Sequence, residues 1–386
     1  MKVVQVCIGK FHHFDLARQL DKRGVLERFY TGYPAFKLKD ELLPLDKIVT
    51  YPWLSVPSMV LPKYGLFPGW AEHALHRWAH ETLDSHVAAN LPECDVLIAL
   101  SGSGLYAGRL AQQRGGHFVC DRGSSHIRYQ DAILREEFRR WGDCFAGIDP
   151  KVMVKEEQEY ESADVITVPS EFVRRSFVQM GVSAEKLRKV PYGVDLQRFE
   201  KVGEPSGQHF DVLFVGQVSF RKGVPDLLDA FARFRHPNKR LRVVGSLQPE
   251  MRRYLAHRPA EKGVEFLGHI PQRQLKVIMS QSHVMVLPSI EEGLAMNQAQ
   301  TMACGCPVVG TTNTGAEDLF TDQVEGFIVA PRDPGAITEK LELLADEPDK
   351  RERMSEAALK RVTELGGWDA YGERMVSVLT ELLGRR

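Results

Sequence analysis

The sequence lacks an excess of charge of either sign, because 50 Lys+Arg stand against 51 Asp+Glu for a net charge of −1. Proteins that bind nucleic acid through phosphate contacts carry a basic surface, so this balance gives no support to nucleic-acid binding. Long apolar runs are also missing, and none approaches the ~18 residues of a membrane-spanning helix. The apolar start, Val3–Ile8, is too short for a signal peptide. We expect a cytoplasmic protein that at most rests on the inner face of a membrane.

Cysteine is scarce: six are scattered along the chain, and only Cys304 and Cys306 lie close together. A lone C-x-C lacks the second pair of ligands that a zinc site of this kind needs. The sequence therefore predicts free thiols in a reducing compartment and no metal site.

Short apolar, β-branched runs alternate with helical patterns along most of the 386 residues. Such strands, separated by helices, are typical of a parallel sheet covered on both faces. The pattern restarts after a turn-rich segment, Lys201–Gln208. We predict an α/β protein of two doubly wound, Rossmann-like domains, residues 1–203 and 204–365, facing each other across a cleft. The helical segment 366–386 either crosses back to the first domain or is an ordinary terminal helix.

A candidate phosphate-binding loop lies in Asp211–Asp226, where a buried strand ends at Gly216 and a helix begins near Val224. Glycines allow the backbone to approach a ligand, and a helix N-terminus offers free N–H groups. With the adjacent cations Arg221 and Lys222, the segment predicts a diphosphate site. A surface loop with solvated basic residues is the alternative.

A second candidate segment, Val284–Val309, places Glu292 between a strand and a helix. The backbone N–H groups of Gly293, Leu294 and Ala295 are expected to face the cleft, and Glu292 to accept bonds from hydroxyls. Gln300 falls about two turns, or about 12 Å, further along the helix. The alternative is that these are helix-capping side chains on a solvent face.

These segments resemble the family 4 retaining glycosyltransferases, the group related to bacterial glycogen synthase. PSIEEGLAMNQAQTMACGCPVV resembles the family signature, FVGQVSFRKGVPDLLDAF the phosphate loop and VEFLGHIPQRQL the base-binding loop. EEQEYESADVITVPSEFVRRSF with VPYGVDLQRF, and TTNTGAEDLFTDQVEGFIV, match further segments in the same order. The resemblance covers most of residues 155–365 and implies the GT-B fold, with the donor nucleotide on the second domain.

The resemblance also implies roles for individual residues. In the E-x7-E signature the first acid, here Glu292, contacts the donor sugar, and the second, which contacts the ribose, falls on Gln300. The phosphate-binding pair of Arg and Lys falls on Gln217 and Lys222, so the Arg is missing, and Arg221 is a hypothetical replacement. Base contacts fall on the backbone of His269 and Ile270.

In the first domain, we expect Gly9, at the end of the first strand, to approach the donor phosphate. Family members often carry a His near the donor sugar, and His126 in the loop Asp121–Tyr129 is the candidate, with a structural His as the alternative. The predicted catalytic residues are thus Glu292, Lys222 and His126.

The resemblance implies retaining transfer from a UDP- or GDP-sugar to a glycan or lipid-linked acceptor, with neither a metal nor a cofactor. Surface polysaccharide, lipopolysaccharide or glycolipid assembly is the expected setting. A nucleotide-sugar 2-epimerase or hydrolase of the same fold, and a non-catalytic binding protein, remain alternatives. Tyr51–Trp70, rich in prolines and aromatics, is predicted to be a loop, either folded onto its own domain or contacting a lipid acceptor or the membrane.

Overall fold

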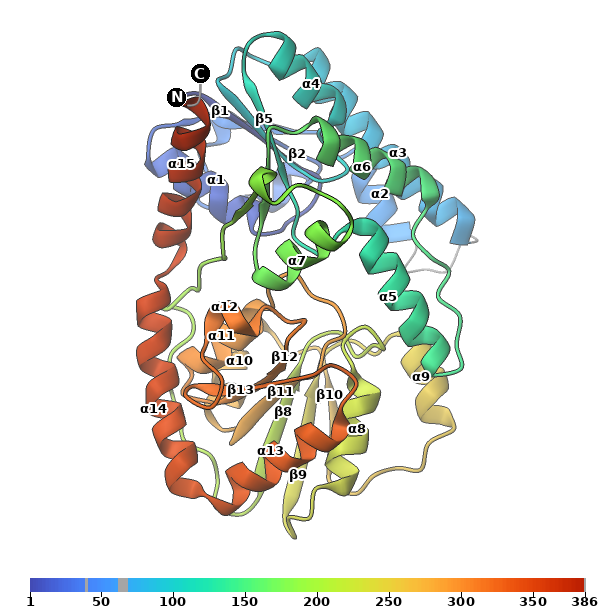
Figure 1. Cartoon of the computed structure of the whole chain (residues 1–386), viewed down its shortest axis with the longest axis vertical. Coiled ribbons are helices and arrows are strands. Elements are labelled where there is room, and N and C mark those ends of the chain that lie inside the picture. Colours follow the sequence, from blue (N-terminus) through green and yellow to red (C-terminus); the bar gives the residue numbers. More distant parts are fainter. Residues whose placement is uncertain (39–40, 62–68, 385–386) are drawn as a thin grey trace.

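The computed structural model describes residues 1–38, 41–61 and 69–384 and consists of two α/β lobes stacked along the long axis of the molecule (Figure 1). The strands of the first domain are β1 (Val3–Cys7), β2 (Leu26–Thr31), β3 (Ile48–Thr50), β4 (Val96–Leu100), β5 (His117–Asp121), β6 (Val165–Val168) and β7 (Leu187–Lys189). Its helices are α1 (His13–Lys22), η1 (Ala35–Lys37), η2 (Leu45–Lys47), α2 (Ser55–Val60), α3 (Gly69–Ala89), α4 (Leu105–Gln113), α5 (Ile127–Arg140), α6 (Pro150–Ser162), α7 (Glu171–Gln179) and η4 (Ala184–Lys186).

The second domain follows from residue 210. Its strands are β8 (Phe210–Val215), β9 (Lys239–Val244), β10 (Val264–Gly268), β11 (Val284–Leu287), β12 (Val308–Thr311) and β13 (Gly326–Val329). Its helices are α8 (Val224–Arg233), α9 (Pro249–Ala256), α10 (Gln272–Ser280), α11 (Met296–Ala303), α12 (Ala316–Leu319) and α13 (Pro334–Asp346), followed by α14 (Pro348–Leu365) and α15 (Trp368–Leu383).

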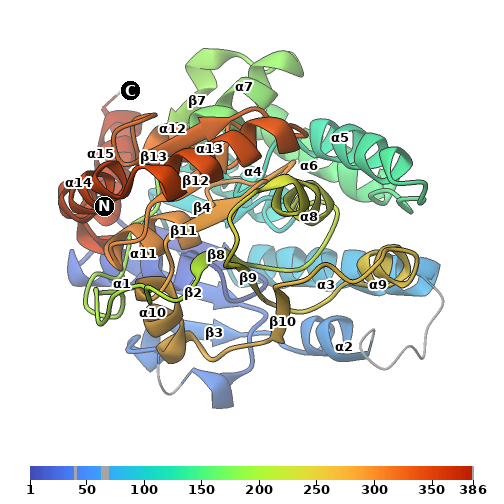
Figure 2. The same cartoon turned by 90° about the horizontal axis from the view of Figure 1, so that it is seen from below.

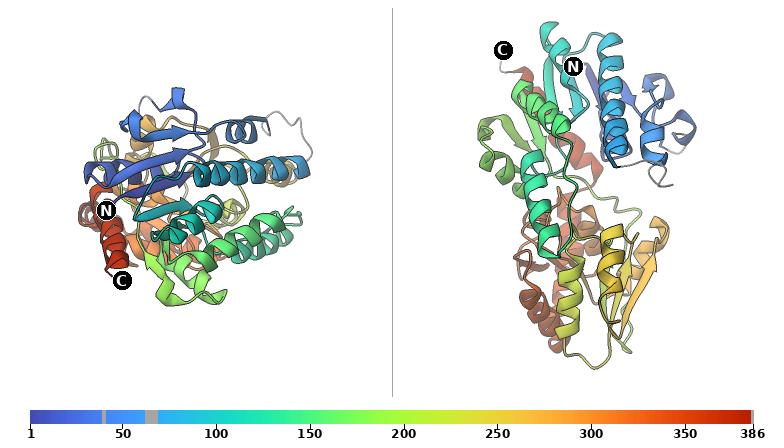
Figure 3. Two further views of the ribbon diagram at one scale, coloured as in Figure 1. Left: turned by 90° about the horizontal axis from the view of Figure 1, so that it is seen from above. Right: turned by 90° about the vertical axis from the view of Figure 1, so that its right-hand side faces the viewer.

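Both sheets are parallel, which confirms the predicted fold class. The first has the strand order β3-β2-β1-β4-β5-β6-β7 and the second β10-β9-β8-β11-β12-β13. Seen from below, helices cover both sides of the second sheet (Figure 2). Strands such as β1, β8 and β11 are buried along their whole length because both faces are covered. Since parallel strands share one direction, their carboxyl ends collect at one edge, and these two edges face each other across the domain boundary (Figure 3).

The C-terminal helix α15 returns to the first domain. It follows α14 along one side of the molecule and ends beside α1 (Figure 1). Tyr371, Met375 and Leu379 are fully buried in the core that also contains Phe14 and Leu16 of α1. The ion pair between Lys22 and Asp369 is 2.7 Å long. The end of the chain therefore ties the two domains together.

Helix α5 makes a second connection, since it reaches from the first domain to α8 and α9 of the second (Figure 3). Arg140 near its C-terminus donates two hydrogen bonds, of 2.8 and 2.6 Å, to the buried carboxylate of Asp226 in α8. One turn earlier, the buried Glu137 accepts bonds from Arg332 and Trp141. These contacts fix α5 on the second domain.

The prediction of a loop for Tyr51–Trp70 fits residues 51–54 but is wrong for residues 55–60 and from residue 69 onward. Residues 55–60 form α2 and α3 begins at Gly69, whereas residues 62–68 lie outside the described residues. Pro57 is compatible with α2 because it lies in the first turn, where a backbone N–H has no intrahelical acceptor. Across the described residues, none of the helices combines the length and apolar character that crossing a membrane requires.

We predict that Leu379→Ala weakens folding, because it opens a cavity where α15 packs on α1. The free energy of unfolding, measured by urea denaturation, should fall by about 2–5 kcal/mol. Ser377→Ala, at an exposed position of the same helix, is the control and should change it by less than about 0.5 kcal/mol. Equal effects of the two substitutions would contradict the packing described here.

Candidate active site

The phosphate loop of the second domain, residues 216–223, is pressed against the segment that follows β11. Gly223, the N-cap of α8, has φ of 65°, and a Cβ added there would lie 2.0 Å from the carbonyl oxygen of Pro288. Only glycine fits this left-handed, crowded position without strain. The contact places Arg221 and Lys222 directly opposite Glu291 and Glu292.

The predicted pair Lys222 and Glu292 is brought together. Lys222 Nζ contacts Glu292 Oε1, and Arg221 Nη2 lies 3.9 Å from Glu292 Oε2. The side chains of Lys222 and Glu292 are mostly buried, so their charges are weakly screened by solvent. Two cations thus converge on one carboxylate at the carboxyl edge of the second sheet. A diphosphate bound by the same cations would have to displace this carboxylate or share them with it.

Glu291, which the sequence analysis did not single out, joins the two domains. It is fully buried and accepts bonds from Ser125 N and Oγ, at 3.0 and 2.7 Å, and from Arg221 Nε at 2.9 Å. Burial by itself would raise the pKa of Glu291, but Arg221 and the bonds from Ser125 hold that pKa below its usual value. The carboxylate is therefore charged. Its neighbour Glu292 was the only available signal, because the partner Ser125 is far away in the sequence.

The turn before α11 was predicted to offer three backbone N–H groups to the cleft. The prediction is wrong for Ala295, whose N–H donates to the carbonyl of Thr314 at 3.1 Å. Gly293 lies against the first domain: Ser170 Oγ donates to its carbonyl at 2.5 Å, and an added Cβ would lie 1.7 Å from Gly123 O. Leu294 is buried.

The remaining predicted donor residues of the second domain lie just after β8, just after β10 or on α11. An added Cβ at Gly216 would lie 3.7 Å from Lys222 Cε, so this glycine adjoins the lysine. His269 follows the end of β10 and is exposed, and Ile270 packs on the core of the domain. Gln217 is exposed, and Gln300 is half-buried on α11.

Asn297, also on α11, was not predicted. Its Nδ2 donates to Val215 O at 2.5 Å, which ties the first turn of α11 to the end of β8. Its buried Oδ1 has no protein partner among the described residues. A buried amide oxygen next to the phosphate loop can accept a bond from a ligand or a water.

In the first domain, the polar group at the cleft edge is built on Asp121, at the end of β5. Its carboxylate accepts bonds from Thr167 at 2.5 Å and from His12 at 2.6 Å, and His13 Nε2 lies 3.2 Å away. Burial opposes ionisation, but the two histidines and Thr167 lower the pKa of Asp121 to about 2. Among the described residues, His12, His13 and Asp121 form the group whose donor atoms are close enough together to ligate a metal ion. Gly9 lies in the same loop as His12, and an added Cβ there would meet the ring of Phe11 at 2.9 Å.

The contacts of His126 favour the alternative of a structural histidine. The residue caps α5, where its Nδ1 accepts a bond from Arg128 N, and its ring packs between Tyr160 and Phe177 within the first domain. Burial and the charge of Arg122 lower the pKa of His126 to about 4, so the ring is neutral. These contacts give His126 a structural role within the first domain, and its catalytic role stays a prediction.

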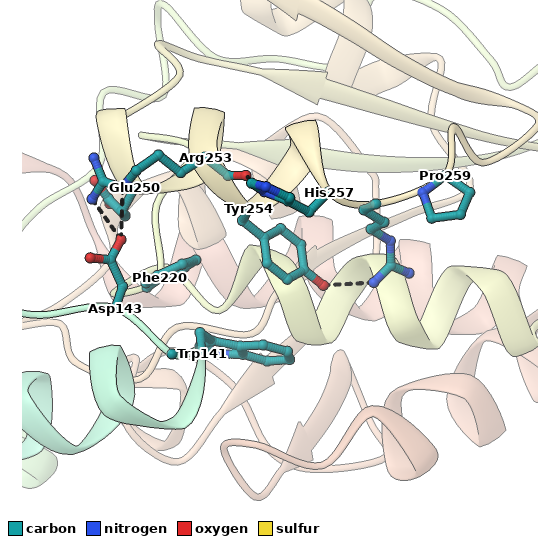
Figure 4. Close-up of a pocket in the computed structure, with 10 residues that line it drawn as sticks. Trp141, Asp143, Phe220, Glu250, Arg253, Tyr254, His257 and Pro259 are labelled. Atoms are coloured by element: carbon teal, nitrogen blue, oxygen red, sulfur yellow. Dashed lines mark hydrogen bonds and ion pairs between the residues drawn. The ribbon is translucent and has the colours of Figure 1, made fainter.

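A pocket of about 650 Å³ adjoins the phosphate loop at Phe220, between the end of α5 and α9 (Figure 4). Trp141, Phe220 and Tyr254 give it an aromatic wall. Its cations are already paired, Arg253 with Asp143 at 2.6 Å and Arg258 with Asp229 at 2.6 Å. The pocket is therefore largely neutral and is formed by both domains.

Comparison with known proteins shows which families and structures the chain resembles. Residues 197–361 match the family described as glycosyl transferases group 1. A D-inositol 3-phosphate glycosyltransferase of Thermomonospora curvata is 29% identical over 306 residues, which are 71% of this chain and 68% of that protein. A GDP-mannose-dependent monoacylated α-(1-6)-phosphatidylinositol monomannoside mannosyltransferase of Corynebacterium glutamicum is 25% identical over 241 residues, 56% of this chain and 62% of that protein. The crystal structure of Anabaena Alr3699/HepE in complex with UDP has a TM-score of 0.70 at 18% identity and covers 99% of this chain and 100% of that one.

We predict that His126→Asn keeps transferase activity and makes stability less dependent on pH. Asn caps a helix without titrating. The folded-state pKa of His126, about 4, lies below the ordinary value of 6.5, so the unfolded chain binds the extra proton. The stability that the neutral His126 ring contributes is fully present above pH 6.5. It falls by up to about 3 kcal/mol as the pH decreases to 4. Urea denaturation at pH 7 and 4.5 measures it; loss of activity in this variant would assign His126 to catalysis instead.

Proposed function

We propose that the chain is a glycosyltransferase of group 1 that transfers a sugar, with retention, from a nucleotide diphosphate sugar to a glycan or lipid-linked acceptor. The family match of residues 197–361 and the shared fold support this proposal. The observation that carries the proposal is the convergence of Lys222 and Arg221 on Glu292. Two cations next to an acceptor of hydroxyl hydrogen bonds suit a ligand that joins a diphosphate to a sugar. The UDP complex of the Anabaena protein and the GDP-mannose dependence of the Corynebacterium enzyme support a UDP- or GDP-sugar.

The proposed reaction needs no nucleophile from the protein. The bond between the anomeric carbon and the β-phosphate oxygen breaks, and an acceptor hydroxyl forms a new bond to the same face of that carbon. The hydroxyl proton passes to the leaving phosphate oxygen. Lys222 and Arg221 stabilise the charge that develops on this phosphate, and Glu292 holds the sugar hydroxyls. Because these cations supply the positive charge at the leaving group, we propose transfer without an obligatory metal and without a cofactor.

We propose that the acceptor binds to the first domain. The pathway we propose is surface polysaccharide, lipopolysaccharide or glycolipid synthesis. The name of the Corynebacterium relative includes a phosphatidylinositol mannoside, which supports a lipid-linked acceptor. Apolar side chains on the first domain are strongly exposed, at 71% for Phe36, 87% for Leu42 and 75% for Trp53. These side chains make peripheral contact with a membrane reasonable, and one of them, Trp53, lies in the segment predicted for it, residues 51–70.

The membrane proposal predicts that the protein floats with vesicles of phosphatidylethanolamine and phosphatidylglycerol in a density gradient. Trp53→Ser should reduce the floating fraction, because an interfacial indole is lost. Val324→Ser, at another exposed apolar position, is the control and should leave it unchanged. If the unsubstituted protein stays at the bottom of the gradient, the contact with the membrane is disproved.

The transferase proposal predicts that UDP or GDP raises the melting temperature of the protein, since a ligand that binds only the native state stabilises it. The increase should survive EDTA. Lys222→Ala should remove the increase and lower the transfer rate by about 100-fold or more, whereas Lys360→Ala, on the exposed face of α14, should behave as wild type. With the preferred donor sugar, NMR of the product should show the donor's anomeric configuration. No response to UDP, GDP or ADP, or an inverted product, would contradict the proposal.

A further inference from the structure

We propose that Glu291 is a positioning residue: it holds Arg221 in the donor-phosphate site and makes that placement depend on contact with the first domain. This inference rests on the proposed function, since it concerns the same diphosphate site. It assigns to the first of two adjacent acids a role distinct from that of Glu292.

Arg221 is held by two hydrogen bonds to Glu291. Its Nε donates both to Glu291 Oε2 at 2.9 Å and to the backbone carbonyl of Glu291 at 3.1 Å. This anchors the guanidinium by its Nε edge. Nη2 then lies 3.9 Å from Glu292 Oε2, on the carboxylate that Lys222 also contacts. The terminal nitrogens of Arg221 are therefore directed to the place where the donor phosphate is expected.

Glu291 is held in turn by two residues of the first domain. Oε1 accepts two bonds from Ser125, and Oε2 accepts a bond from Gln130 Nε2 at 3.1 Å in addition to that from Arg221. Ser125 lies in the loop after β5 and Gln130 in the first turns of α5, so both belong to the first domain. Gln130 Oε1 in turn accepts a bond from Arg122 Nη2 at 3.0 Å. A continuous set of bonds thus runs from the first domain to Arg221.

The surroundings of the Glu291 side chain require a carboxylate at this position. All four side-chain bonds of Glu291 come from N–H or O–H donors, and the side chain is fully buried. An amide in its place would turn an NH₂ group toward one of these donors and leave Arg221 without its charged partner. Glu291→Gln therefore keeps the volume of the side chain and removes the orienting interaction.

The test is a double-mutant cycle on nucleotide affinity, measured by calorimetry with UDP and GDP. We expect Glu291→Gln and Arg221→Ala each to weaken binding of the preferred nucleotide by about tenfold, and the double variant to be no weaker than either. Ser125→Ala, which removes one donor at little structural cost, should weaken it by about threefold.

The control is Asp318→Asn, another carboxylate that joins the domains. Asp318 accepts a bond from Glu171 N at 2.7 Å and pairs with Lys189 at 2.6 Å, away from the phosphate loop. A residue that only joined the domains would behave like Asp318→Asn, with a lower melting temperature and unchanged affinity. If Glu291→Gln lowers only the melting temperature, or if its loss of affinity adds to that of Arg221→Ala, the inference is overturned. The proposed function would not be affected by either result. If the unsubstituted protein binds neither UDP nor GDP, the proposed function fails and the inference fails with it.

Discussion

The close approach of two sheet edges is the constraint on which the rest of the structure depends. Gly293 of the second domain lies so near Gly123 of the first that an added Cβ would be 1.7 Å from a backbone oxygen. No side chain can separate the two loops there, so the groups beside them meet directly across the domain boundary. Ser170 donates to the Gly293 carbonyl on one side of this contact, and Ser125 donates to Glu291 on the other. The candidate active site lies where neither domain alone could complete it.

The charges at this contact are expensive to bury, and the structure shows how each is compensated. Glu291 has four donors, Lys222 contacts Glu292, and Arg221 lies against both acids. Removing one partner of such a buried pair commonly costs about 3–5 kcal/mol, because the other charge stays buried without a partner. A substitution that removes a charge but keeps the size of the side chain, such as Glu291→Gln, therefore disturbs the packing at this contact less than truncation does. The packing of α15 on the first domain supplies stability away from the site.

Much of the fold and part of the site could be predicted from the sequence, because some signals are local. Apolar β-branched runs predicted the parallel sheets, and motif spacing singled out Lys222 and Glu292, although their ion pair was not predicted. Strand β2, with Glu27 and Arg28 in LERFYT, breaks the apolar pattern and was missed. Glu291 and the His12–Asp121 pair depend on partners distant in the sequence, so spacing could not reveal them. The sequence could not show that Gly123 and Ser125 are the residues after β5 that meet the second domain, while the ring of His126 packs within its own domain.

The role proposed for Arg221 would account for the absence of the arginine expected at Gln217. Position 217 comes two residues after the end of β8, and the glutamine there is exposed. Arg221 comes from the far end of the same loop, next to the N-terminus of α8, and reaches the site only if its long side chain is held at Nε. Glu291 provides that hold, and it is itself fixed by bonds from the other domain. A change of one cation therefore makes physical sense only together with the buried acid that faces it, which ties the donor site to the arrangement of the two domains.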